Sequence, residues 1–160
     1  MAESCDQIEP NGALPPIAAA IIRSAASGDL AAQRRIRQAW CDRLDPARPA
    51  GANDDMMAAS GLFVARMCAA NGDHSDAQML ATLLLTAGAR LHDSGRVPLG
   101  WEFIAESLSL YERMSAAGDV EATDIVDDLV PTLPCEVVAR AQFYARREKE
   151  ASDASTNPEA

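Results

Sequence analysis

The sequence has few aromatic residues, little positive charge and no apolar run long enough to cross a membrane. Aromatic residues make up 4% of the 160 residues, so a core has to be built from Ala, Leu, Ile, Val and Met. Small aliphatic side chains favour close-packed helices over sheets, which prefer β-branched and aromatic residues. The apolar segment 17–22 ends at Arg23 and is far shorter than the roughly 20 residues of a membrane helix. These absences predict an all-α protein that does not enter a membrane.

Basic residues are outnumbered, 14 Lys and Arg against 24 Asp and Glu, which gives a formal net charge of −10. A surface of this sign repels phosphate backbones and anionic lipids, so we expect neither nucleic acid nor membrane as a partner. The first ten residues are acidic where a secretory signal is basic. The sequence therefore predicts a soluble, cytoplasmic protein.

Recognisable catalytic chemistry is also scarce. The four cysteines are widely spaced and form no C-x-x-C pair, which is typical of free thiols in a reducing compartment. His92-Asp93 resembles the metal-binding pair of certain phosphohydrolases, but two histidines cannot supply the remaining ligands, and His74-x-Asp76 lacks partners as well. We expect no catalysis, no metal and no cofactor. A metal-dependent hydrolase using His92 and Asp93 remains the alternative from another class.

What the sequence does contain is one pentapeptide written three times, as A-A-S-G-D, A-A-N-G-D and S-A-A-G-D at 25–29, 69–73 and 115–119. Each glycine follows a helix-forming run and is expected to close a helix in the left-handed conformation. Each aspartate is expected to cap the next helix and to complement its dipole. The motif therefore predicts three tight helix–helix turns.

The repetition continues into the helices. Ala32, Ala77 and Ala122 lie 45 residues apart, and apolar residues recur at the same register four, seven and eight positions later. A fixed period between about 20 and 50 residues indicates stacked supersecondary units. The predicted helices are 17–27, 30–44, 55–71, 75–93, 99–117, 120–130 and 135–149.

The segment 77–122 resembles a Sel1-like repeat, the longer relative of the tetratricopeptide repeat. It reads A-Q-M-L-A-T-L-L-L-T-A-G-A-R-L-H-D-S-G-R-V and then E-S-L-S-L-Y-E-R-M-S-A-A-G-D-V-E-A. Gly95 and Val97 occupy the turn of that pattern, Tyr111 its aromatic position, and 116–118 its close. A weaker copy begins at Ala32 and ends at Gly72.

This resemblance implies a right-handed α-α superhelix that binds proteins as an adaptor or scaffold. HEAT-like repeats of similar period are the structural alternative. In such arrays the first helix of each pair lines the concave surface, so polar positions opposite the apolar stripe become candidates for partner binding. The candidate partner-binding residues are Arg34, Arg37, Gln38, Met79, Thr82, Leu83, Asp124, Asp127 and Asp128.

This row runs from basic through apolar to acidic, and it predicts a groove for an extended peptide or helix with complementary ends. A specialised chaperone is the alternative function, with methionines as adaptable contacts. The predicted organisation is a flexible leader over 1–16, one repeat domain over 17–149 capped by the last helix, and a disordered tail over 150–160. The apolar segment 17–22 makes a homodimer a further possibility.

Overall fold

The computed structural model describes residues 16–41 and 54–156, and all regular structure in these ranges is helical. The prediction of an all-α protein is therefore confirmed. The elements are α1 (Pro16–Ala26), α2 (Leu30–Cys41), α3 (Asp54–Asn71), α4 (His74–Asp93), α5 (Val97–Ala116), α6 (Val120–Leu129), a short 3-10 turn (Val130–Thr132) and α7 (Cys135–Thr156).

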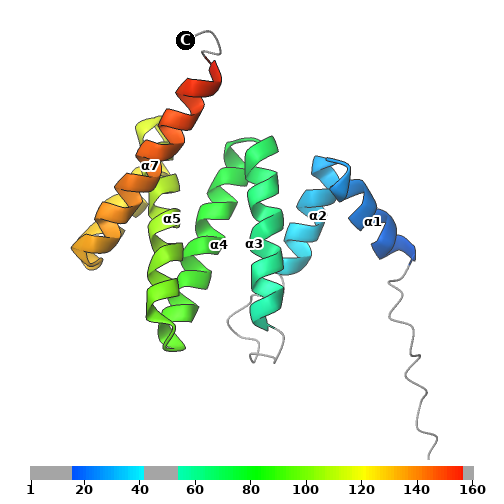
Figure 1. The fold of residues 1–160 in the computed structure, drawn as a ribbon, viewed down its shortest axis with the longest axis horizontal. Helices are drawn as coiled ribbons and strands as arrows, with labels where there is room; N and C mark the ends of the chain where they lie inside the picture. The colour runs from blue at the N-terminus through cyan, green and yellow to red at the C-terminus, as the bar shows by residue number, and fades with distance from the viewer. Residues whose placement is uncertain (1–15, 42–53, 157–160) are drawn as a thin grey trace, which may run out of the picture.

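The helices follow one another along the long axis of the molecule, with α1 at one end and α7 at the other (Figure 1). Sequence neighbours pack together from α1 to α6, and α7 packs against α5. None of the helices in the described ranges has both the length and the hydropathy that spanning a bilayer requires. The predicted leader and the predicted loop at 45–54 lie almost wholly outside the described residues.

The last helix is longer than the sequence predicted. It was expected to end at residue 149 and to be followed by an irregular tail over 150–160, but α7 continues to Thr156. The physical reason is that no glycine or proline interrupts the chain before Pro158, so the helical hydrogen bonds continue through the polar segment.

Two of the three predicted glycine turns have the expected geometry. Gly28 and Gly118 have φ values of 93° and 95°. The amide after each glycine donates to the carbonyl five residues earlier, from Asp29 to Ser24 and from Asp119 to Met114. These bonds satisfy carbonyls that a helix end leaves open. Gly95 forms a third turn of this kind, with φ 83°.

Gly72 was predicted to be left-handed, and that prediction is wrong, because its φ is not positive. It is needed for a different reason. A Cβ at this position would lie 2.6 Å from the carbonyl oxygen of Cys68 and 2.7 Å from Cγ of Asp76. Only a residue without a side chain lets the chain pass this close to the buried carboxylate of Asp76.

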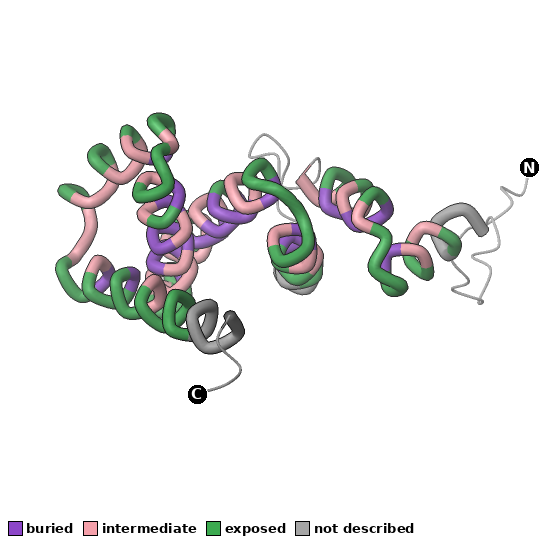
Figure 2. Tube along the Cα trace, turned by 90° about the horizontal axis from the view of Figure 1, so that it is seen from above, coloured by how far each residue is buried: buried purple, intermediate pink, exposed green. Residues whose placement is uncertain are grey.

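The core consists of aliphatic clusters between successive helices, as the low aromatic content requires. One cluster joins α3 to α4 and a second joins α5 to α7, while a third contains residues of α4, α5 and α6. Leu84 and Leu108 are fully buried within them. Figure 2 shows the buried positions concentrated in the middle of the array. Of the register positions, Ala32, Ala81, Leu84 and Ala122 are buried, whereas Ala39 is exposed.

Two helices approach each other closely at glycines of α4 and α5. A Cβ on Gly100 would lie 2.7 Å from the carbonyl oxygen of Gly88 and 2.9 Å from the amide nitrogen of His92. A Cβ on Gly88 would lie 2.7 Å from Cγ1 of Ile104. Small residues at both positions therefore set the separation of the two helices.

We expect Gly88→Ala and Gly100→Ala each to lower the free energy of unfolding by about 1–3 kcal/mol, because the added methyl group overpacks a backbone contact. Urea unfolding followed by circular dichroism measures the change. The matched control is Ala89→Ser at an exposed position of α4, which should change stability by less than about 0.5 kcal/mol. Unchanged stability of both glycine variants would contradict the close approach.

Candidate functional site

A buried carboxylate holds the first two turns of α4 against α2. Asp76 is 1% exposed, and both of its oxygens accept hydrogen bonds from arginines of α2. Nε of Arg34 lies 3.1 Å from each oxygen, and its Nη2 lies 2.5 Å from Oδ2. Nη1 of Arg37 donates to Oδ1. Two guanidinium groups thus surround one carboxylate.

The same aspartate is part of the N-terminal cap of α4. The side chain of Asp73 accepts the backbone N–H of Asp76, and Oδ2 of Asp76 accepts the backbone N–H of Asp73, each at 3.3 Å. Arg34 also binds Asp73 at 3.0 Å. The cap therefore helps to orient the carboxylate towards the arginines.

Hydrogen bonds from Arg34 and Arg37 lower the pKa of Asp76 to about 2, and Arg34 makes the larger contribution. The same bonds raise the pKa of Arg34. The nearby thiol of Cys68 has a raised pKa because it is buried. Asp76 is therefore ionised at physiological pH, and its ion pairs with Arg34 and Arg37 join α4 to α2.

The beginnings of α4 and α6 are joined in a similar way. Nε2 of His74 lies 2.5 Å from Oδ2 of Asp119, the residue that caps α6. Nε2 of Gln78 donates to Glu121 at 3.0 Å. Side-chain contacts therefore connect α2 to the start of α4, and the start of α4 to the start of α6.

Arg37 and Leu83 do not lie on an open groove, and the expectation that they do is wrong. Arg37 is 8% exposed and turned into the α2–α4 contact, while Leu83, also 8% exposed, belongs to the cluster between α3 and α4. Met79 packs against that cluster as well. The sequence pattern assumes that each helix buries one apolar stripe. Tertiary packing also buries a second side of α2 and α4, which includes Arg37 and Leu83.

The remaining candidates stay at the surface. Arg34 is partly exposed but bound by Asp76 and Asp73, and Gln38 is exposed. Thr82 is exposed on α4, where its hydroxyl contacts the hydroxyl of Tyr111 at 3.0 Å. Asp124, Asp127 and Asp128 are exposed on α6, and within the described ranges none of these three forms an ion pair.

We call the surface of Gln78, Thr82, Glu121, Asp124 and Asp127 the α4–α6 face. The contacts His74–Asp119 and Gln78–Glu121 show that α4 and α6 lie beside one another at their starts. One helical turn further on, the next positions are Thr82 and Asp124. On α6, Asp124 and Asp127 thus follow Asp119 and Glu121, which contact side chains of α4.

The surface formed by α3, α5 and α7 differs from the α4–α6 face, because several of its acids form ion pairs with arginines. Arg66 of α3 binds Glu106 of α5 at 2.5 Å, and the hydroxyl of Tyr144 donates to Glu102 at 2.6 Å. Two further ion pairs join α5 to α7, Glu102 with Arg140 and Arg113 with Glu148.

His92 and Asp93, the candidates for a metal-dependent hydrolase, lie at the end of α4. Nδ1 of His92 is 3.8 Å from Oδ1 of Asp93, and the His92 ring packs on Trp101 with centroids 4.6 Å apart. A search of the described residues finds no group of three or more His, Cys, Asp or Glu placed to hold a metal ion. Among the described cysteines, Cys68 and Cys135 are reduced thiols, whereas Cys5 lies outside the described residues.

The methionines proposed as adaptable contacts for a chaperone are partly enclosed. Met114 is 6% exposed in the cluster of α4, α5 and α6, and Met79 packs against the core. Met56 and Met57 belong to the start of α3, whose side chains lie outside the described residues.

Of the apolar residues considered for a homodimer, Ile22 is 45% exposed.

Comparison of the chain with protein-family models, with curated proteins and with solved structures finds no match in any of the three.

Sequence reasoning missed the central role of Asp76. A signal was present, because D-x-x-D at 73–76 places a second acid where a capping box has its reciprocal acceptor. The spacing of Arg34 and Arg37 places both on one side of α2. What the sequence does not show is that these two surfaces meet.

We expect Asp76→Asn to lower the free energy of unfolding at neutral pH by about 3 kcal/mol, because it leaves the buried charge of Arg37 uncompensated. Urea unfolding measures the difference from wild type. Asp127→Asn is the matched control, since it makes the same chemical change at an exposed aspartate and should cost less than about 0.5 kcal/mol. Equal effects of the two variants would contradict the network.

The same carboxylate predicts a pH dependence. Its pKa is about 2 in the folded chain and near 3.8 when unfolded, so the unfolded state binds more protons between these values. The stability contributed by Asp76 is therefore complete above about pH 4 and is lost as the pH falls towards 2. We expect the stability difference between wild type and Asp76→Asn to shrink over this window. A difference independent of pH would contradict the shift.

Proposed function

We propose that the protein is an interaction module of stacked helix pairs, of the kind that the Sel1-like and tetratricopeptide-like resemblance implies, and that it has no catalytic activity. The proposed ligand is a basic segment of a partner protein, bound across the α4–α6 face. The single observation that carries this proposal is the exposed row of Asp124, Asp127 and Asp128 without ion-pair partners in the described part of the chain.

Charge pairing supports the choice of this face. On α3, α5 and α7 the acids Glu102, Glu106 and Glu148 are already bound by arginines. A partner that used those acids would first have to displace an existing pair. At the aspartates of α6 no ion pair has to be displaced, so their full electrostatic attraction acts on a cationic partner.

The position of the arginines revises the expected polarity of the surface. Arg34 and Arg37 were expected to give one end of a groove a positive charge, but Asp73 and Asp76 neutralise them. The row therefore runs from neutral at α2, through polar Gln78 and Thr82, to acidic at α6. This pattern suits a segment whose basic residues gather towards one end.

The net charge of −10 supports the same class of partner, because the field of the whole chain draws cationic segments towards it and repels acidic ones. Cys68 and Cys135 are in the reduced form, which agrees with a reducing compartment, so we propose a cytoplasmic location. Met79 and Met114 pack within the molecule, so they give the chaperone alternative no comparable support.

Replacing Asp124 and Asp127 by Lys tests the proposal. We expect affinity capture from source-cell lysate to retain a partner on wild type, and we expect the double variant to lose it by at least about tenfold in affinity. The wild-type affinity should also fall as salt is raised.

The control variant is Asp93→Lys with Glu150→Lys, which makes the same change in net charge at exposed positions outside the α4–α6 face. It should retain the partner. Equal capture by wild type, control and the α6 variant, or capture insensitive to salt, would contradict binding at the aspartates.

A further inference from the structure

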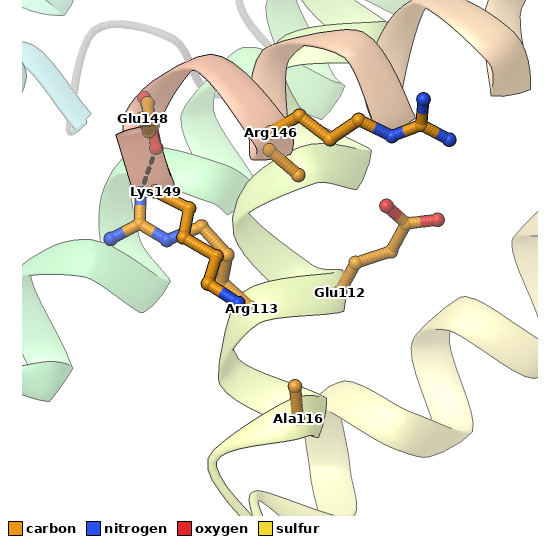
Figure 3. Close-up of a pocket in the computed structure, with 7 residues that line it drawn as sticks. Glu112, Arg113, Ala116, Arg146, Glu148 and Lys149 are labelled. Carbon is orange, nitrogen blue, oxygen red and sulfur yellow. Dashed lines mark hydrogen bonds and ion pairs between the residues drawn. The ribbon is translucent and has the colours of Figure 1, made fainter. Parts of the chain in front are cut away.

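A groove of about 470 Å³ lies between the C-terminal halves of α5 and α7, apart from the α4–α6 face. Its small apolar side chains are Ala145 of α7 and Ala116 of α5. Figure 3 shows Ala116 on α5. The pair between Arg113 and Glu148 ties the two helices together beside it. Because these side chains are small, another chain could approach the two helices closely here.

The other charges that line the groove are not paired with one another. Glu112 of α5 and Arg146 of α7 extend to the same side in Figure 3, and Lys149 lies further along α7. In the described ranges, Glu112, Arg146 and Lys149 form no ion pair, in contrast to the neighbouring acids of α5. Glu112 is half-buried, and this burial raises the pKa of its carboxyl group.

The groove therefore presents one anion on α5 and two cations on α7 across a floor of alanines. We propose that it is a second docking site, for a helical segment of a partner protein that carries Lys or Arg three or four residues from Asp or Glu. The basic residue would bind Glu112, and the acidic residue would bind Arg146 or Lys149. Side chains at this spacing share one face of a helix, as the arrangement demands.

Two features favour a protein segment over a small molecule. The groove is an open channel between two surface helices, whereas small-molecule sites enclose most of their ligand. Its charges are also spread along α5 and α7 rather than converging on one point. A helix lying along the channel contacts both signs of charge at once. The proposal is independent of the α4–α6 face.

The test uses a phage-displayed library of helical peptides, selected on the full chain. Selected peptides are then synthesised, and their affinities for wild type and Glu112→Gln are measured by fluorescence anisotropy. We expect enriched peptides to carry Lys or Arg three or four residues from Asp or Glu. Glu112→Gln should weaken their binding about tenfold or more, because it removes the charge but keeps the shape.

The variant Asp124→Lys with Asp127→Lys separates this proposal from the proposed function. Peptides that occupy the α5–α7 groove should bind it as tightly as wild type. If selected peptides are lost on this variant and unaffected by Glu112→Gln, the groove proposal is overturned and the α4–α6 face remains supported. Failure to enrich any peptide with paired charges overturns it as well.

A second measurement addresses the free protein. Carboxyl NMR follows the titration of Glu112, and we expect its pKa to lie above the ordinary range of a glutamate and to fall when a selected peptide binds. A pKa below the ordinary range in the free protein would mean that Arg146 or Lys149 already neutralises Glu112. The groove would then be closed by its own side chains, and the proposal would be wrong.

Discussion

The contact between α2 and α4 depends on one buried carboxylate. Asp76 is almost fully removed from solvent, and such a charge is tolerated only because Arg34 and Arg37 bind both of its oxygens. The requirement extends to the chain around it. Gly72 has to lack a side chain so that the carboxylate fits, and Asp73 has to cap the helix so that it is aimed. One interaction thus fixes several residue choices.

The same interaction decides which surface is left for a partner. Because Arg34 and Arg37 are used within the molecule, the first helices of the predicted repeats do not present a basic end. Ion pairs between α3, α5 and α7 likewise bind Glu102, Glu106 and Glu148. In the described ranges, the unpaired charges include the row of aspartates on α6 and the three charges of the α5–α7 groove. Both surfaces that we propose for binding therefore carry charges without an internal ion pair.

Packing in the middle of the array depends on small residues rather than on aromatic side chains. Gly88 and Gly100 let the backbones of α4 and α5 approach, and Ala81 and Ala105 are fully buried beside them. Ser107 joins the two helices by donating to the carbonyl of Ala81 at 2.7 Å. A core of this kind has little spare volume, so its tolerance for larger residues is low.

Local features of the sequence determined the helices and most of their ends. Glycines at 28 and 118 terminate helices because they adopt positive φ, and the aspartates after them cap the next helix, since both effects depend on adjacent residues alone. The apolar register likewise located Ala32, Leu84 and Ala122 in the interior. Exposure of Asp124, Asp127 and Asp128 also followed from their positions on one amphipathic helix.

Only the tertiary structure decided what the polar residues contact. Arg37 and Asp76 are 39 residues apart, and nothing in the pattern of either helix shows that the other is its partner. The burial of Leu83 and the close approach of Gly88 to Gly100 depend on how two helices cross. Glu112, Arg146 and Lys149 share a groove for the same reason. Helix formation depends on neighbours in the chain, whereas charge pairing, close packing and grooves depend on neighbours in space.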